Sequence, residues 1–413
     1  MSLRTSEIRA AIASLGVERG EVVLQAAREL ADRDIVEMSE EGKPEASSRF
    51  LLHPRTFGLF DYQDEVVAEL LQCVARGQSA LVSLPTGSGK TRTAVVACLK
   101  MIRQGLIEHV VWVAPSHELV EQARQTLRAV WQSSPGDRVQ TIDGLTMQLS
   151  TGPSWRFGTV QSAASLGEKL EVRAGATVLV FDEAHQALAP TFRKVVQHVR
   201  RRQGVVFGLS ATPGRYTDAE TRQLEALFAG ELIVPRSLSN NPVESLRGRG
   251  VLAELELVGL RDAASADGSS ALQRLAAQIR HRNCAPGIAF VGRIAEAYVA
   301  AVVLTLSGIR AEVVSHDHSR ATRVRKLEDI RTKRLDWLVN VEVLATGIDL
   351  PSLRAVALLT EIGSPILYEQ IIGRVSRGPA VGGQARTIVF DAFDHYRVHG
   401  DASSYSRFLP VAW

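Results

Sequence analysis

Short runs of apolar, mostly β-branched residues alternate with longer segments of helical spacing from about residue 81 onward. Strands that are almost continuously apolar are typical of a parallel sheet covered by helices on both faces. The alternation therefore predicts two α/β domains, each built on a parallel sheet. The strands that we expect are Leu81–Leu84, His109–Ala114, Ala176–Phe181 and Val205–Leu209, followed by Gly287–Gly292, Arg310–Ser315, Trp337–Val343, Ala355–Leu359 and Thr387–Phe390.

A stretch rich in Pro, Ser, Asn, Gly and Arg separates the two series of strands. This composition is typical of a linker, and Pro242, Gly248 and Gly250 within it favour turns. The pattern divides the chain into an N-terminal extension (1–55), a first α/β domain (56–234), a linker (235–254) and a second α/β domain (255–413).

The first fifty residues have a different pattern. Helical spacing covers Ser6–Leu15 and Glu18–Ala31, and a hairpin of Asp34–Met38 with Phe50–His53 would follow. This order is compatible with a small winged-helix unit that docks on nucleic acid or protein. A helical cap packed on the first α/β domain is equally compatible, so both interpretations stay open.

Composition narrows the class of protein but not its function. Of 413 residues, 45% are hydrophobic and 23% are charged, which is an ordinary composition for a globular protein and excludes a mainly disordered chain. The apolar runs are too short to cross a bilayer and no leader opens the chain, so we expect the cytoplasm. The scattered Cys73, Cys98 and Cys284 predict buried thiols. A net charge of +3 permits a polyanionic partner without requiring one.

The segment Leu84–Thr91, with the sequence Leu-Pro-Thr-Gly-Ser-Gly-Lys-Thr, follows a predicted strand and opens a predicted helix. In that setting the backbone N–H groups of a glycine-rich loop and the helix N-terminus bind phosphate, the lysine reaches the outer phosphates, and the threonine hydroxyl binds Mg²⁺. We therefore expect a nucleotide site made of Pro85, Thr86, Gly87, Ser88, Gly89, Lys90 and Thr91.

A second chemical signal is the acidic pair in Asp182-Glu-Ala-His185, which follows the predicted strand Ala176–Phe181. Acidic residues at the end of a strand, downstream of a P-loop, suit Mg²⁺-dependent nucleotide hydrolysis. Asp182 is then expected to hold the metal through water, and Glu183 to polarise the attacking water.

With these two motifs and others in order from about Asp61 to Arg377, the chain resembles superfamily 2 helicases and translocases of the DEAH-box type. The resemblance implies two RecA-like domains in tandem, with ATP and Mg²⁺ bound in the cleft between them. Closure and opening of that cleft would move the protein along a nucleic-acid strand.

The remaining motifs of the first domain take their roles from the resemblance. Gln63, after Tyr62, resembles the glutamine that reads adenine. The residues that would grip nucleic acid are Pro115, Ser116, His117, Gln161 and Ser162, and those that would couple hydrolysis to movement are His185, Ser210 and Thr212.

Two motifs of the second domain are similar to family motifs. Asn340–Asp349 resembles the motif that contacts both the nucleotide and the nucleic acid. The resemblance implies that Gly347 and Asp349 face the nucleotide and that Thr346 faces the nucleic acid. Gln370–Arg377 matches the arginine-finger helix. By that match Gln370, Arg374 and Arg377 are catalytic, and both arginines face the phosphates.

Val343–Pro351 and Gly248–Leu252 look more like the DNA-directed branch of the superfamily, which includes RadD-type repair ATPases, excision-repair helicases and the motors of type I and III restriction enzymes. DNA is therefore the first expectation for the substrate, in repair, restriction or phage defence. An RNA helicase is the main alternative, because such a core grips the phosphate backbone and reads few bases. An ATP-gated scaffold that clamps a partner protein is the third. Targeting or nuclease activity would come from the first fifty residues or from a separate protein.

Two other polar clusters are interpreted without a chemical role. The basic segment Arg320–Lys333 is expected to be a solvated helix face, with a nucleic-acid track as the minority alternative. His316-Asp-His318 has no third ligand nearby and is expected to be a loop.

Overall fold

The computed structural model describes residues 3–17, 20–40, 58–132, 140–143, 152–211, 218–238, 241–260, 270–341 and 353–399. The chain forms two compact units. The first unit contains the described residues from 58 to 248, and the second contains those up to residue 40 together with those from 249 to 399. The second unit is therefore discontinuous in sequence.

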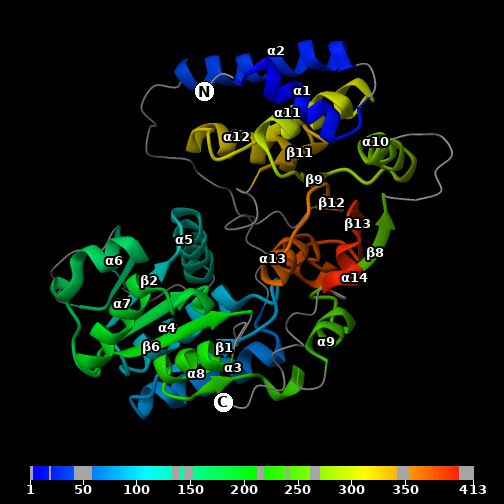
Figure 1. The fold of residues 1–413 in the computed structure, drawn as a ribbon. Coiled ribbons are helices and arrows are strands. Elements are labelled where there is room, and N and C mark those ends of the chain that lie inside the picture. The colour runs from blue at the N-terminus through cyan, green and yellow to red at the C-terminus, as the bar shows by residue number, and fades with distance from the viewer. Residues whose placement is uncertain are drawn as a thin grey trace. The chain divides into compact units, whose positions relative to one another are not determined.

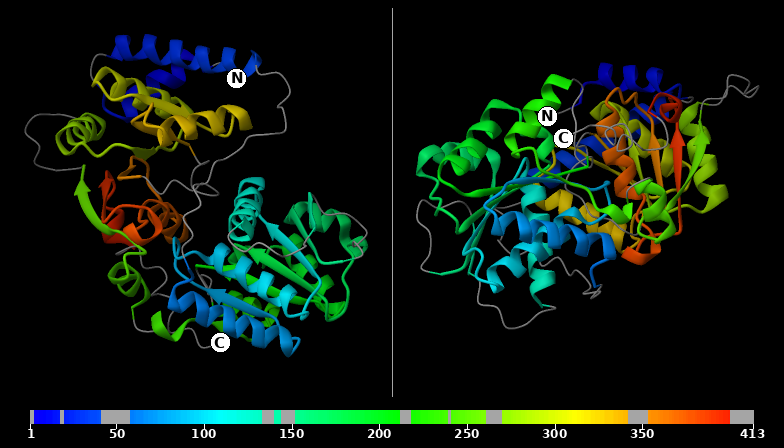
Figure 2. Two further views of the ribbon diagram at one scale, coloured as in Figure 1. Left: turned by 180° about the vertical axis from the view of Figure 1, so that it is seen from behind. Right: turned by 90° about the horizontal axis from the view of Figure 1, so that it is seen from below.

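The first unit is built on a seven-stranded sheet in the order β3-β4-β2-β5-β6-β1-β7, in which all neighbouring strands are parallel. Helices α3, α4 and α5 lie on one face of this sheet, and α6, α7 and α8 lie on the other (Figure 2). The strands are β1 (Ala80–Ser83), β2 (His109–Ala114), β3 (Gln140–Asp143), β4 (Ser154–Thr159), β5 (Thr177–Asp182), β6 (Val205–Ser210) and β7 (Leu232–Ile233); the helices are α3 (Asp61–Ala75), α4 (Lys90–Arg103), α5 (His117–Gln132), α6 (Val160–Leu166), α7 (Pro190–Arg201) and α8 (Asp218–Leu227).

The second unit is built on a six-stranded sheet in the order β10-β11-β9-β12-β13-β8, again with all neighbours parallel. Two α/β folds on parallel sheets are therefore confirmed. The strands are β8 (Glu254–Gly259), β9 (Gly287–Phe290), β10 (Ala311–Val314), β11 (Trp337–Asn340), β12 (Ala355–Leu358) and β13 (Arg386–Asp391); the helices are α10 (Ala271–Arg282), α11 (Ile294–Leu306), α12 (Arg320–Arg331), α13 (Pro365–Val375) and α14 (His395–His399).

The N-terminal helices α1 (Thr5–Ser14) and α2 (Gly20–Glu40) pack on α11 of the second unit (Figure 1). On its other side α11 contacts β10 and β11. Nine residues of α11 between Ala295 and Leu304 are buried. A helix that is apolar on all sides needs cover on more than one side, and α1 and α2 provide it.

The buried positions of α2 show why it is one continuous helix. Val23, Leu24, Ala27, Ala31 and Asp34 are all buried, and their spacing follows the period of an α-helix along a single face. This face continues past Ala31 to Asp34, within the same helix.

Both sequence interpretations of the N-terminal extension therefore need correction. The strand expected over Asp34–Met38 is wrong, because these residues belong to α2; Phe50–His53, its expected partner, lies outside the described residues. The helical cap exists, but it covers the second α/β fold and not the first. The apolar outer side of α11 is the physical reason.

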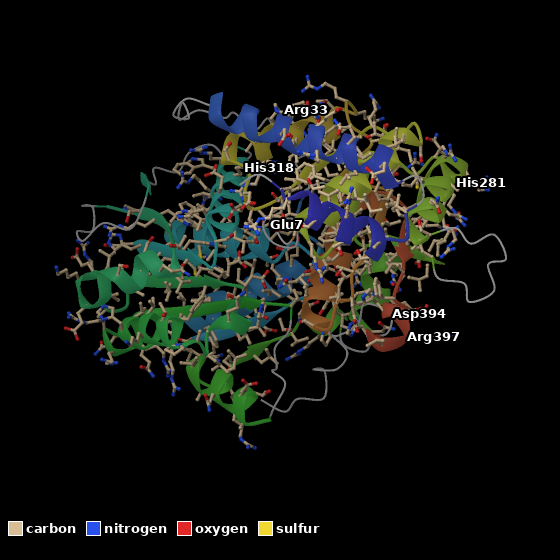
Figure 3. The ribbon with its side chains drawn as sticks, turned by 45° about the horizontal axis from the view of Figure 1, so that its top comes forward. Glu7, Arg33, His281, His318, Asp394 and Arg397 are labelled. Atoms are coloured by element: carbon tan, nitrogen blue, oxygen red, sulfur yellow. The ribbon has the colours of Figure 1, made fainter. Side chains whose placement is uncertain are left out.

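A buried cluster of polar side chains joins α2 to the second sheet. Asp34 accepts a hydrogen bond from the hydroxyl of Tyr298 (3.0 Å), and the ammonium of Lys326 donates to both of its carboxylate oxygens (3.2 Å to Oδ1 and 3.1 Å to Oδ2). His318 accepts the N–H of Ser315 at Nδ1, so its Nε2 carries the proton that it donates to Asp34 (3.1 Å). His318 and the nearby Arg33 of α2 are labelled in Figure 3.

The charge of Asp34 is stabilised by these partners. Burial alone would raise the pKa of Asp34, but the hydrogen bond from His318 and the positive charge of Lys326 outweigh burial and lower the pKa to about 2. Lys326 is 0% exposed. The expectation of a solvated face on Arg320–Lys333 holds for the exposed Arg325 and Arg331, but it is wrong for Lys326.

The expected linker contains ordered elements. Within 235–254 lie a short 3₁₀ turn, η3 (Arg236–Leu238), and helix α9 (Pro242–Gly248), and the side chains of Leu238 and Leu246 are buried. The backbone N–H of Ser237 donates to Glu65 of α3 (3.3 Å). The part before residue 249 thus packs with the first unit.

Cys73, Cys98 and Cys284 are buried free thiols, as predicted. Across the described ranges, no helix is both long enough and apolar enough to span a bilayer. The same ranges contain no group of three His, Cys, Asp or Glu side chains arranged to hold a metal.

Candidate nucleotide and nucleic-acid site

The loop between β1 and α4 has the backbone of a phosphate-binding loop. Gly87 and Gly89 have φ of 84° and 87°, in the left-handed region that glycine adopts without strain. A Cβ on Gly89 would lie 2.6 Å from Nε2 of Gln63. Both the curvature of the loop and its close approach to α3 therefore require glycine at this position.

Helix α3 fixes the shape of this loop through two side chains. The hydroxyl of Tyr62 and Nε2 of Gln63 both donate to the carbonyl of Ser88, at 2.7 and 3.0 Å. Oε1 of Gln63 accepts the N–H of Phe60 (3.1 Å), whose ring stacks on Tyr62. Gln63 is thus placed beside the loop, as expected. The hydroxyl contact of Tyr62 was not predicted, and its sequence signal is the aromatic residue next to the glutamine.

Lys90 is the first residue of α4, so its charge lies at the positive end of a helix dipole. Its ammonium is held inside the loop by the carbonyls of Leu84 (3.2 Å) and Pro85 (3.4 Å). The hydroxyl of Ser88 donates to the carbonyl of Pro85 (2.6 Å). Positive charge and helix N–H groups are thus gathered where the sequence predicts a phosphate.

Asp182 ends β5, next to the strand that carries Ser210 and one strand away from the loop. It is 4% exposed, and its Oδ1 accepts the N–H of Glu183 (3.0 Å). Burial and the neighbouring Glu183 carboxylate raise the pKa of Asp182 to about 7, against the opposing effects of Lys90 and a hydrogen bond with Thr91.

These interactions bring together Lys90, Thr91 and Asp182, as the sequence predicts. A carboxylate and a hydroxyl are ligands that Mg²⁺ prefers. Because the ionised form of Asp182 is destabilised by burial and by a second carboxylate, a divalent cation would relieve a charge that the protein alone leaves poorly compensated. The side chains present therefore fit Mg²⁺.

Glu183 has a left-handed backbone, with φ 54° and ψ 50°, which is costly for a residue with a side chain. The turn places its carboxylate 3.4 Å from Nδ1 of His185, in the 3₁₀ turn η2 (Ala184–Gln186). Nδ1 of His185 is also 3.5 Å from the hydroxyl of Ser210 at the end of β6. Three predicted site residues thus form a chain from β5 to β6.

The residues expected to grip nucleic acid follow two strands that are neighbours in the first sheet, β2 and β4. Pro115 and Ser116 connect β2 to α5, and the exposed His117 is the first residue of α5. Gln161 and Ser162 are exposed in the first turn of α6, where Thr159 accepts the N–H of Ser162 (3.2 Å). Because parallel strands end at the same edge of a sheet, both groups lie at the edge where β5 delivers Asp182.

In the second unit, Gln370 and Arg374 lie on α13, four residues apart and therefore on one face of the helix. Arg377 is not on the helix, because α13 ends at Val375 and Arg377 pairs with Leu252 as a β-bridge. Gly378 makes this possible, since a Cβ there would lie 2.1 Å from the carbonyl of Gly250.

Four predicted residues fall in parts of the chain that the structure does not describe. Thr212 lies between residues 211 and 218, and Thr346, Gly347 and Asp349 lie between residues 341 and 353. Their roles stay predictions.

Two protein families match the chain. Residues 56–215, with the P-loop and the acidic pair, match the type III restriction enzyme res subunit. Residues 270–378, with α13, match the helicase conserved C-terminal domain.

Individual proteins show the same likeness. The chain is 26% identical over 371 residues to putative helicase 22 of Sulfolobus islandicus filamentous virus, covering 81% of this chain and 64% of that protein. It is 30% identical over 192 residues to the putative ATP-dependent DNA helicase fml2 of Schizosaccharomyces pombe, covering 44% of this chain and 24% of that protein. The chain thus spans less than two thirds of the length of these relatives.

The structure of S. cerevisiae Dbp5 bound to RNA and ADP BeF3 resembles this chain with a TM-score of 0.58 and 18% identity, covering 86% of this chain and 92% of that one. The likeness shows that the two α/β units have the fold of tandem RecA-like domains.

Proposed function

We propose that this chain, which belongs to helicase superfamily 2, couples ATP hydrolysis to movement along DNA. The observation that carries the proposal is the arrangement of Lys90, Thr91 and Asp182 around a glycine-rich loop, with Glu183 held beside them in a left-handed turn. This is the set of groups that phosphoryl transfer to water requires.

In this proposal each group of the first unit has one task. Backbone N–H groups from Thr86 to Gly89 and the ammonium of Lys90 bind the phosphates, and Gln63 reads the base. Thr91 and Asp182 hold Mg²⁺, which when bound supplies a Lewis acid that neutralises charge on the phosphoryl group. Glu183 orients the attacking water.

The second unit completes the site in the proposed cycle. Gln370, Arg374 and Arg377 act on the phosphates, together with Gly347 and Asp349. An arginine supplied to a nucleotide in this way accelerates hydrolysis by about 10³ to 10⁵. Its arrival and departure then couple the chemistry to domain movement.

Movement along DNA follows from the chain of side chains between Glu183 and Ser210. His185 contacts both, so a change at the position of the attacking water is transmitted to Ser210 at the end of β6. Thr212, two residues further along the sequence, takes part in this coupling in the proposal. Pro115, Ser116, His117, Gln161, Ser162 and Thr346 grip the phosphate backbone. DNA is favoured by the resemblance to restriction-enzyme motors, and repair, restriction or phage defence are the pathways that we propose.

The decisive experiment is ATP turnover by the full chain alone and with single-stranded DNA, duplex DNA or RNA. We expect stimulation by one form of DNA that exceeds stimulation by RNA. Preference for RNA would identify an RNA helicase, and equal turnover with and without every nucleic acid would favour an ATP-gated scaffold.

Two variants test the site itself. We expect Lys90→Ala and Glu183→Gln to abolish turnover, while Glu183→Gln still binds ATP. Lys100→Ala, on the outer part of the same helix α4, is the matched control and should hydrolyse ATP at the wild-type rate. Turnover near the wild-type rate in both site variants would refute the assignment.

A further inference from the structure

Two histidines hold one residue of the loop that leads into α13. Ile362 lies between β12 and α13 and is 4% exposed. Its N–H donates to Nε2 of His395 (2.9 Å), and its carbonyl accepts a hydrogen bond from Nε2 of His399 (2.6 Å). Both backbone polar groups of Ile362 are therefore satisfied by imidazoles of α14. Asp394 and Arg397, labelled in Figure 3, mark the place of α14.

The partners of His395 fix its tautomer. Because Nε2 accepts a backbone N–H, the ring proton lies on Nδ1, which donates to Oδ1 of Asp391 (2.7 Å). Asp391 also accepts the N–H groups of Phe393 and Tyr396. Burial would raise the pKa of Asp391, but these hydrogen bonds outweigh burial and hold the pKa below its usual range.

The same histidines pack against α13 itself. Tyr368, in the first turns of α13, is 2% exposed, and its ring centroid lies 6.0 Å from that of His395 and 5.2 Å from that of His399. The histidines thus hold both the loop and the helix that follows it. We name His395 and His399 the histidine clamp.

Helix geometry connects the clamp to the predicted catalytic positions. At about 100° per residue, positions 370 and 374 lie about 200° and 240° around α13 from position 368. The face that carries Gln370 and Arg374 is therefore nearly opposite the face that packs on the clamp. For a helix about 10–12 Å wide with its side chains, a rotation of about 10° moves the outer surface by about 1 Å.

We propose that His395 and His399 are positioning residues, which set the rotation of α13 and thereby the placement of positions 370 and 374, to which the proposed function assigns catalytic roles. This inference rests on the proposed function. A displacement of about 1 Å at a catalytic group costs up to about 100-fold in rate, so loss of the clamp affects turnover more than nucleotide binding.

The test compares His399→Leu, His399→Gln and His399→Asn with the wild type in ATP turnover, ADP binding and thermal unfolding. Leucine removes the donor, glutamine places an amide N–H near the position of Nε2, and asparagine is too short to reach it. We expect about 10- to 100-fold lower kcat for Leu and Asn, recovery within about threefold for Gln, and unchanged ADP affinity. His281→Leu, an exposed histidine of the same unit, is the matched control.

Equal kcat in the wild type and His399→Leu, or equal losses in the Gln and Asn variants, would overturn the inference. If His399→Leu does not fold, the Gln and Asn pair decides. Failure of the proposed function would give a different result: the wild-type chain would show no ATP turnover beyond that of the Lys90→Ala variant. In that case hydrogen exchange across residues 362–375 still tests the clamp, because Asn and not Gln should accelerate it; equal exchange in both would reject the clamp.

Discussion

The ammonium of Lys326 lies 3.1 Å from a carboxylate oxygen of Asp34, although the two residues are 292 positions apart in the sequence. Lys326 is 0% exposed and Asp34 is 3% exposed. Because both groups are almost fully removed from water, their charges are stabilised by protein partners, which for Lys326 also include Glu312 at 3.7 Å. The contact therefore stabilises the packing of α2 on the second unit.

Replacing Asp34 should destabilise the second unit strongly. Asp34→Asn removes the nearer of two counter-charges of the buried Lys326 ammonium and leaves only Glu312, at 3.7 Å. Breaking a buried ion pair by removing one partner typically costs about 3–5 kcal/mol. Asp32→Asn, at an exposed position of the same helix, should change the free energy of unfolding by less than about 0.5 kcal/mol. Denaturant unfolding of each variant measures the difference.

The double variant Asp34→Asn with Lys326→Met should recover much of that loss, because it removes both charges and leaves an amide to accept from Tyr298 or His318. Additive losses in the double variant would show that the pair is not coupled.

The contribution of Asp34 should disappear in acid. Its pKa is lowered to about 2 in the folded state, from an ordinary value of 3.8. A lowered pKa stabilises the fold above about pH 4, and the stabilisation is lost as the pH falls toward 2. The difference in the free energy of unfolding between the wild type and Asp34→Asn should therefore become smaller from pH 4 to pH 2. Unfolding measured at a series of pH values tests this. A constant gap from pH 6 to pH 2 would contradict the assignment.

Asp182 should show the opposite dependence on pH. Burial and Glu183 raise its pKa to about 7, so its charge destabilises the fold above that pH, and the destabilisation fades as the pH falls toward 4. Without nucleotide or Mg²⁺, the Tm of Asp182→Asn at pH 8 should therefore be higher than that of the wild type, by about 2–4 °C for each kcal/mol of added stability. At pH 4 the two proteins should have the same Tm. The same variant should lose ATP hydrolysis. Asp64→Asn, on the exposed side of α3, serves as the control.

A side chain on Gly89 should damage the phosphate loop. Gly89→Ala forces φ near 87° on alanine and drives a Cβ to 2.6 Å from Gln63. ADP binding should weaken at least about tenfold, or about 1.4 kcal/mol, in calorimetric titration. Gly248→Ala is the control, because a Cβ there meets nothing within 4 Å. Wild-type ADP affinity in Gly89→Ala would show that this loop does not hold the phosphates.

Strands in the middle of each sheet could be predicted because both of their faces are buried. β2 has the predicted bounds, and all six of its residues are buried. β4 and β8 were missed for different reasons. β4 contains Arg156, which is 0% exposed in spite of its charge, and β8 is an edge strand in which Glu254 and Glu256 interrupt the apolar run.

The candidate site could be predicted where function resides in a contiguous motif. The P-loop and the acidic pair are of this kind, and Gln63 could be assigned to the nucleotide site from its own short motif ahead of the P-loop. The contacts that bind the site together depend on distant residues, as in the hydrogen bond from Tyr62 to Ser88 and the approach of His185 to Ser210. An apolar face likewise gives no indication of which domain it will cover, which is why the position of α1 and α2 needed the structure.

The hydrogen bond from Tyr298 to Asp34 joins residues 264 positions apart. At about 5–20 residues per second, a ribosome needs about 13 to 53 seconds to synthesise that interval. Throughout this time α2 has been synthesised and α11 has not, while the whole first unit is produced. The apolar stripe of α2 is therefore exposed on the nascent chain, and late docking of an early segment completes the second unit.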